Sequence, residues 1–249
     1  MRPDKFQEQK KKQQNLIRFN WALNHILLNK INFGILEGFI SVLLRENLSI
    51  ISIGESEINK TSPQDKFNRV DMLVQNEKNE IFIIELQISS ELEYFYCMPY
   101  GVSKAVIESL NSNDDYSNKI RNIYHISIVY FDFAQEDDYV YYGHNNFYGV
   151  HNNNRLTLSE KEEKFLRINA IDIFSEYYIL QVNSFNNVVK NQLDEWIYYL
   201  KNEEVLDEFT ALGLSLIREK LTYNHLSEKD KKDYMHYLSI MNNVPISNC

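Results

Sequence analysis

One segment constrains the fold of this chain more than any other: two apolar runs that are joined by a short polar turn and carry polar groups inside them. The runs cover residues 70–75 and 81–88, are rich in Val, Ile, Leu and Phe, and are separated by the polar residues 76–80. This pattern predicts an antiparallel hairpin. Glu85 lies inside the second run with apolar residues on both sides, which is typical of a strand in the middle of a sheet.

The hairpin also predicts which side chains meet. If the turn is symmetric about Lys78, positions equally far from it face each other, and Asp71 then lies opposite Glu85. Facing side chains are about 5 Å apart, so two carboxylates there repel each other. Gln87 projects from the same face as Glu85, because strand side chains alternate. Bound Mg²⁺ or Mn²⁺ removes the conflict, since both ions prefer hard oxygen ligands.

A simpler alternative keeps the same hairpin without a site. In that interpretation Asp71 and Glu85 flank an edge strand and face water, or a slip of one residue sends them to opposite faces of the sheet. The apolar neighbours of Glu85 argue against it. A buried ionised carboxylate must be paired, neutralised or bound to a metal, so the sequence favours a functional site.

Composition limits the classes of protein that remain. The 249 residues carry a formal net charge of −9, which argues against coating nucleic acid through bulk charge but allows local contacts with phosphate. The two cysteines, Cys97 and Cys249, have no metal-ligand spacing and fit a reducing compartment. The first residues lack the apolar core of a signal peptide, so we expect a cytoplasmic protein.

The order of elements predicts an α/β fold with a mixed central sheet, because a hairpin is followed by a helical crossover and a further strand. We expect a flexible basic tail over residues 1–15, a core over 16–150 and a mainly helical subdomain over 151–249 packed on that core. Helices are predicted over 16–28, 33–44, 92–110, 188–201, 205–221 and 227–241, and further strands over 48–58, 124–133, 139–144 and 177–182.

Several segments, taken in order, resemble a known family. They are Lys66-FNRVDMLV, Ile83-IELQ, Tyr100-GVSK, Ile126-SIVYFDF, Asp138-YVYYGH, Phe174-SEYYILQVNSFN and Leu193-DEWIYYLKN. The chain resembles the PD-(D/E)xK nuclease superfamily, and within it the PD-(D/E)xK nuclease family transposases, which are related to the recombination-promoting nucleases of the Rpn family. This resemblance implies a restriction-endonuclease-like αβββαβ core and metal-dependent cleavage of DNA phosphodiester bonds.

The resemblance also implies roles for single residues. Asp71 and Glu85 match the metal ligands, which would hold Mg²⁺ or Mn²⁺. Gln87 stands where the superfamily more often has lysine, and Glu37 matches an acidic helical position that often assists the metal. Glutamine can only donate or accept hydrogen bonds, so activity would depend strongly on the metal.

Lysine side chains are the candidates for holding the phosphate. Lys66 and Lys104 lie within the segments that carry the resemblance and are the cations we expect to contact it. Relatives in the superfamily often dimerise to cut both strands, so a homodimer is expected by analogy.

A second hypothesis is a catalytically silent nuclease-like module that binds DNA or a protein partner. It is motivated by the acidic net charge, by Gln87, and by Cys97, which stands where the family commonly has an arginine. The histidines at positions 125, 144 and 151 have no metal-ligand spacing and are interpreted as structural or surface residues. No phosphate-binding glycine loop or serine-hydrolase elbow is present in the sequence.

Overall fold

The computed structural model describes residues 16–54, 72–87, 95, 98–103, 105, 122–132, 138–157, 159 and 175–243. The predicted tail over residues 1–15 lies outside this set. The chain divides into two compact units: Met1–Leu48 together with Phe185–Cys249, and Ser49–Ser184. This division differs from the boundary predicted at residue 150, because a strand beyond that residue joins the sheet of the second unit.

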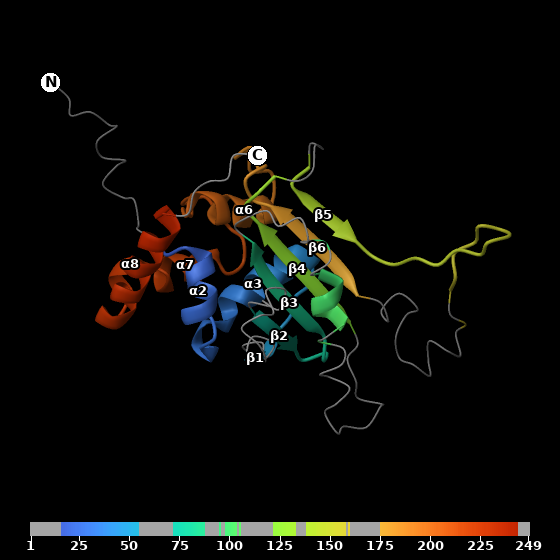
Figure 1. The fold of residues 1–249 in the computed structure, drawn as a ribbon, viewed down its shortest axis with the longest axis horizontal. Helices are drawn as coiled ribbons and strands as arrows, with labels where there is room; N and C mark the ends of the chain where they lie inside the picture. Colours follow the sequence, from blue (N-terminus) through green and yellow to red (C-terminus); the bar gives the residue numbers. More distant parts are fainter. Residues whose placement is uncertain are drawn as a thin grey trace. The chain divides into compact units, whose positions relative to one another are not determined.

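The unit Ser49–Ser184 contains one six-stranded sheet in the order β1-β2-β3-β4-β6-β5 (Figure 1). Its strands are β1 (Ile50–Gly54), β2 (Met72–Asn76), β3 (Ile81–Gln87), β4 (Ile123–Val129), β5 (Val140–Gly143) and β6 (Glu176–Gln181). β2 is antiparallel to both β1 and β3, β4 runs parallel to both β3 and β6, and β5 is antiparallel to β6. The predicted α/β class with a mixed sheet is therefore confirmed.

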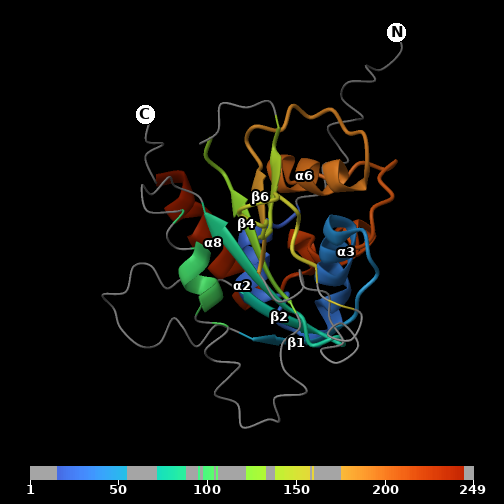
Figure 2. The same ribbon diagram turned by 90° about the vertical axis from the view of Figure 1, so that its right-hand side faces the viewer.

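The strands in the middle of this sheet are apolar because both of their faces are covered. Every residue of β4 is buried, and so are the first five residues of β3. On one face, Ile81, Ile83 and Ile123 pack against Val102 and Ala105. Val102 and Ala105 belong to the helical segment around residues 98–105, which Figure 2 shows in green beside the sheet. This face also carries the candidate site.

The other unit is helical. It contains α2 (Phe19–His25), η2 (Lys30–Asn32), α3 (Phe33–Leu44), α6 (Gln192–Asn202), α7 (Leu214–Lys220), η5 (Tyr223–His225) and α8 (Glu228–Asn243). The helix predicted over residues 33–44 has the predicted bounds. The one predicted from residue 188 begins at Gln192, because the side chain of Asn191 accepts the free amide hydrogens of Leu193 and Asp194 and caps the helix there.

Aromatic side chains form the core of the helical unit. The ring of Phe19 lies edge-on to those of Phe39, Trp196 and Tyr199, each with a centroid distance of 6.1 Å. The indole N–H of Trp196 donates to the Leu212 carbonyl at 3.0 Å, so the buried ring leaves no polar atom unpaired. Trp196 and Trp21 are both buried and are thus core residues.

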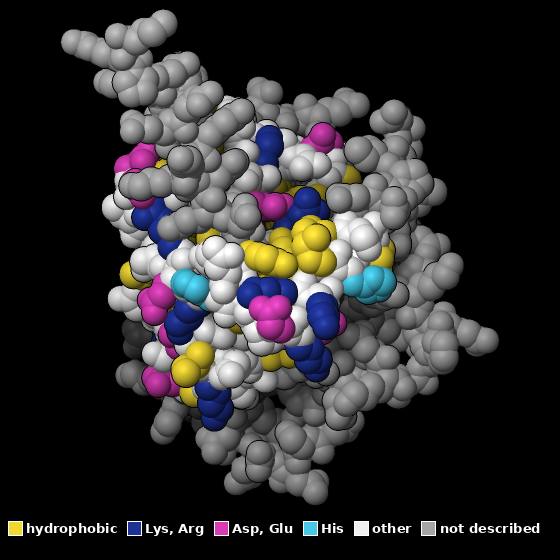
Figure 3. Space-filling view, turned by 90° about the vertical axis from the view of Figure 1, so that its left-hand side faces the viewer, with side chains coloured by type: hydrophobic (Ala, Val, Ile, Leu, Met, Phe, Trp, Pro, Cys, Tyr) yellow, Lys and Arg dark blue, Asp and Glu magenta, His cyan; other side chains and the backbone are white. Residues whose placement is uncertain are grey.

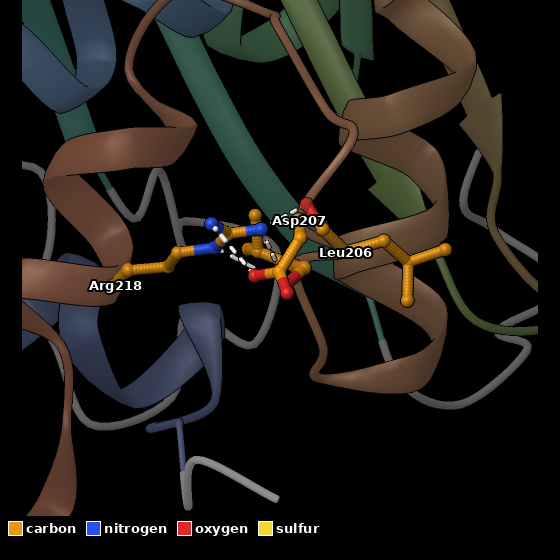
Figure 4. A network of polar contacts seen from close by, with 4 residues as sticks. Leu206, Asp207 and Arg218 are labelled. Carbon is orange, nitrogen blue, oxygen red and sulfur yellow. Dashed lines mark hydrogen bonds and ion pairs between the residues drawn. The ribbon is translucent and has the colours of Figure 1, made fainter. Parts of the chain in front are cut away.

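The prediction of a helix over residues 205–221 is wrong for its first half, since α7 begins only at Leu214. Arg218 explains the difference (Figure 4). Its guanidinium donates to the carbonyls of Val205 and Leu206, and it forms an ion pair with Asp207 at 3.3 Å. Those carbonyls are thereby satisfied without a helix. Gly213, at φ 86°, supplies the left-handed turn that starts α7.

One face of the molecule shows charges of both signs mixed together. The face in Figure 3 carries Lys and Arg side chains interspersed with Asp and Glu around a small hydrophobic group. Among the described residues, no helix combines the length and the apolar character needed to cross a membrane.

Candidate active site

Glu85 lies on β3, which has β2 on one side and β4 on the other. Only 5% of the residue is exposed, although it is a carboxylate inside an apolar strand. The prediction that it occupies a central strand is therefore confirmed. The alternative, an acid that faces water from an edge strand, is wrong for Glu85.

The β2–β3 hairpin has the predicted register. Met72 pairs with Ile84 and Gln75 with Ile81, so facing residues are equally far from Lys78. The side chain of Asn76 fixes this turn: its oxygen accepts the backbone N–H of Lys78 at 3.0 Å and that of Glu80 at 2.9 Å. A local network thus sets the pairing of the whole hairpin.

Three of the predicted site residues cannot be placed. Asp71 precedes the first described residue of β2, and Lys66 and Lys104 also lie outside the described residues, as does Cys97. Their roles stay predictions. Leu73, which faces Ile83 across the hairpin, packs against the same cluster as Ile83, so that pair lies on the face of Glu85.

The parallel pairing of β3 with β4 brings two polar side chains to Glu85. Glu85 faces Ser127 in the register, and His125 lies two residues earlier on the same face. The Nε2 atom of His125 is 3.3 Å from Oε2 of Glu85. On the other side of the ring, Nδ1 is 3.2 Å from the hydroxyl of Ser127. His125 and Ser127 are both 0% exposed, so the three side chains form a buried polar row.

Apolar groups surround this row. The ring of Tyr177, on β6, is 6.0 Å from that of His125, and Tyr177 also packs against Met98 and Val129. Burial raises the pKa of Tyr177, so its phenol stays neutral over the ordinary pH range. Water is largely excluded from the Glu85 carboxylate, so each polar interaction that the carboxylate keeps is electrostatically stronger than it would be in water.

Gln87 ends β3 and faces Val129 of β4. It is half-buried, and it lies two residues beyond Glu85, so the two side chains share a face as predicted. The strand therefore presents a carboxylate followed by an amide. Both are hard oxygen ligands of the kind that Mg²⁺ and Mn²⁺ prefer.

Glu37 belongs to the helical unit. It lies in α3 and is half-buried between the buried residues Leu36 and Gly38. At the next residue, a Cβ added to Gly38 would fall 2.4 Å from the backbone of Leu212, so the side of α3 that carries Gly38 is closely packed. The part of Glu37 in a metal site stays a prediction.

The described residues supply part of a metal site. Within that part of the chain, no group of three or more His, Cys, Asp or Glu residues could hold an ion. Glu85 and Gln87 offer oxygen ligands of the right kind, and Mg²⁺ needs only one or two carboxylates because water and phosphate complete its shell. The donor set therefore fits such an ion, provided that Asp71 supplies the second carboxylate.

His125 and Ser127 are the residues that sequence reasoning underrated. The interpretation of His125 as a structural histidine agrees with its burial, but its contact with Glu85 was not foreseen. A signal was present, because His125 and Ser127 interrupt an apolar strand at alternate positions, as Glu85 and Gln87 do in β3. What was missing was the register between two strands that no short turn connects.

A mixed α/β sheet whose central strand carries an acid and an amide two residues apart is consistent with the restriction-endonuclease-like fold of the PD-(D/E)xK nucleases. The chain belongs to the PD-(D/E)XK nuclease family transposases, whose family model matches residues 18–243. The resemblance drawn from the sequence is confirmed. Searches of the curated proteins and of the solved structures gave no match. PD-(D/E)XK nucleases typically use divalent metal ions.

Proposed function

We propose that this protein is a DNA endonuclease that hydrolyses phosphodiester bonds with Mg²⁺ or Mn²⁺ held by Asp71 and Glu85. The register of the β2–β3 hairpin carries the proposal. Its pairs, Met72 with Ile84 and Leu73 with Ile83, are those expected if Asp71 lies opposite Glu85 one pair further on. Two carboxylates about 5 Å apart repel each other unless a cation lies between them.

The bound ion would polarise the phosphate and lower the pKa of the attacking water. The residues of the chain divide the remaining tasks. Asp71 and Glu85 orient the ion, and Gln87 positions the water or a phosphate oxygen through hydrogen bonds. Lys66 and Lys104 are proposed to contact the phosphate, and Glu37 is proposed to assist the metal. DNA is the proposed partner, and a homodimer is proposed by analogy with superfamily relatives.

A second candidate function is a catalytically silent module that binds DNA or a protein. The contact between Glu85 and His125, 3.3 Å apart and both buried, is the observation that favours it. An imidazole can satisfy a buried carboxylate without any metal. Gln87 and Cys97, which replace a lysine and an arginine common in relatives, point the same way.

A plasmid-nicking assay with Mg²⁺ or Mn²⁺ tests the leading proposal. We expect the wild type to nick supercoiled DNA and Asp71→Ala and Glu85→Ala to lose at least about 100-fold of that activity, because each removes a ligand. Glu77→Ala is the matched control, since it removes an equal charge from an exposed position of the same hairpin. Equal nicking by all four proteins would reject the assignments.

Calorimetric titration with Mn²⁺ separates the two candidates. The nuclease should bind Mn²⁺ in a way that Asp71→Ala and Glu85→Ala each abolish. A silent module should bind DNA or protein equally well with and without these substitutions and show no such metal binding.

A further inference from the structure

We propose that His125 is a positioning residue for Glu85: it donates its Nε2 hydrogen to the Glu85 carboxylate and so holds it for the metal. This inference rests on the proposed function and adds a residue to its site. It starts from the row in which Nε2 of His125 is 3.3 Å from Oε2 of Glu85 and Nδ1 is 3.2 Å from the hydroxyl of Ser127.

Burial is the first argument. A carboxylate that is only 5% exposed has lost most of the water that would otherwise hydrate its charge. Among the described residues, the imidazole of His125 is the one group in polar contact with it. The ring is itself 0% exposed, so it cannot exchange this contact for water.

The second argument is an orphaned atom. Nε2 of His125 is buried and, within the part of the chain that the structure describes, makes no aligned hydrogen bond. At 3.3 Å from Oε2 it lies just beyond the usual distance for an N–H···O bond. The proposed bond therefore requires a small rotation of one of the two side chains, and apo structures of active sites often have such loose contacts.

The Glu85 carboxylate gives the row a direction, because a carboxylate can only accept and the hydrogen between the two groups must come from Nε2. The Ser127 hydroxyl, which can donate or accept, then donates to Nδ1. In the opposite tautomer, the lone pair of Nε2 would face the lone pairs of Oε2. The hydrogen-bond partner of one ring nitrogen thus decides what the other can do.

The contact with His125 uses Oε2, and no other described residue is in polar contact with Oε1, the oxygen proposed to bind the ion. Hydrogen bonds to a ligating group fix its orientation, and removing such an outer partner typically costs about 10- to 100-fold in metal affinity or activity. His125 would therefore act through Glu85 without touching the substrate.

Mn²⁺ titration of the full chain, read alongside its unfolding, tests the inference. We expect His125→Leu to weaken Mn²⁺ binding about 10- to 100-fold and to lower kcat for nicking more than it changes KM. His125→Gln should recover much of the affinity, because its amide can still donate. Ser127→Ala should weaken binding by a smaller factor, since only the tautomer preference is lost. His151→Ala, at an exposed histidine, is the matched control.

Nitrogen-15 NMR of the metal-free wild type provides a readout that needs no variant to fold. A hydrogen on Nε2 of His125 is expected, and a ring that carries its hydrogen on Nδ1 alone would overturn the inference. Unchanged Mn²⁺ affinity in folded His125→Leu and His125→Gln would also overturn it. If the wild type still nicked DNA in that case, the proposed function would stand without this inference. A wild type with neither Glu85-dependent Mn²⁺ binding nor nicking would instead defeat the proposed function and this inference with it.

Discussion

Two buried glutamates, one in each unit, are satisfied in different ways. Glu195, 8% exposed, accepts the backbone N–H groups of Thr210 at 2.8 Å and Ala211 at 2.6 Å. Glu85 contacts the imidazole of His125 and, among the described residues, has no backbone donor. Backbone amides are fixed in place and commit a carboxylate to the fold. A single ring contact leaves part of the carboxylate available, so the kind of donor, more than burial, separates a structural acid from a candidate ligand.

The largest effect on stability is expected at Glu195. Glu195→Ala leaves the amides of Thr210 and Ala211 unpaired, and the free energy of unfolding should fall by about 3 kcal/mol. Denaturant unfolding measures this loss. Glu195→Gln should lose less, because its amide oxygen still accepts a hydrogen bond, and nicking per folded molecule should stay unchanged in both variants. A loss below about 0.5 kcal/mol, the range of an ordinary surface change, would break the comparison.

Glu85 should behave in the opposite way. Glu85→Gln removes a desolvated charge that has few donors, so the free energy of unfolding should stay level or rise by about 1 kcal/mol, while nicking is lost. Denaturant unfolding and the plasmid assay, run on one preparation, measure both. If Glu85→Gln destabilises the protein as much as Glu195→Ala does, Glu85 is a structural acid like Glu195.

A third carboxylate gives the smallest effect. Burial raises the pKa of Glu203, although Arg18, whose Nε lies 2.6 Å from its Oε1, lowers it. Since the folded-state pKa is above the ordinary value, the contribution of Glu203 to stability is complete below that value and is lost as the pH rises through the folded-state pKa. The effect is small because 39% of the side chain is exposed and water screens it.

Thermal unfolding between about pH 4 and about pH 7 measures that contribution. The wild type should lose Tm relative to Glu203→Gln as the pH rises through this window. Glu208→Gln, at an exposed position of the same unit, should follow the wild type. Parallel profiles for the wild type and Glu203→Gln would show that Arg18 fully offsets the burial.

Local patterns were enough to predict much of the sheet. The hairpin register followed from two apolar runs and a polar turn, because Asn76 ties the turn to its own neighbours through hydrogen bonds. The bounds of α3 followed from a continuous apolar run. In both cases the interactions that decide the structure join residues close in sequence.

The features that sequence reasoning missed depend on distant partners. β6 enters the sheet between β4 and β5, although β5 comes first in the chain, and only long-range pairing decides that order. The loop before α7 is held by Arg218 and Glu195, whose side chains compete with the helix for its backbone groups. The contact of His125 with Glu85 likewise depends on a parallel register that no turn fixes.

The parallel pairing of β3 with β4 has a consequence for how the site assembles during folding. The hairpin that carries Glu85 closes between neighbours in sequence, whereas Ile123 must reach Ile81 from much further along the chain, which is slower and costs more entropy. Until β4 docks, water can still hydrate the Glu85 side chain. When β4 docks, it displaces that water and brings the His125 imidazole to the carboxylate. The carboxylate thus loses its hydration and gains its new polar partner in the same step.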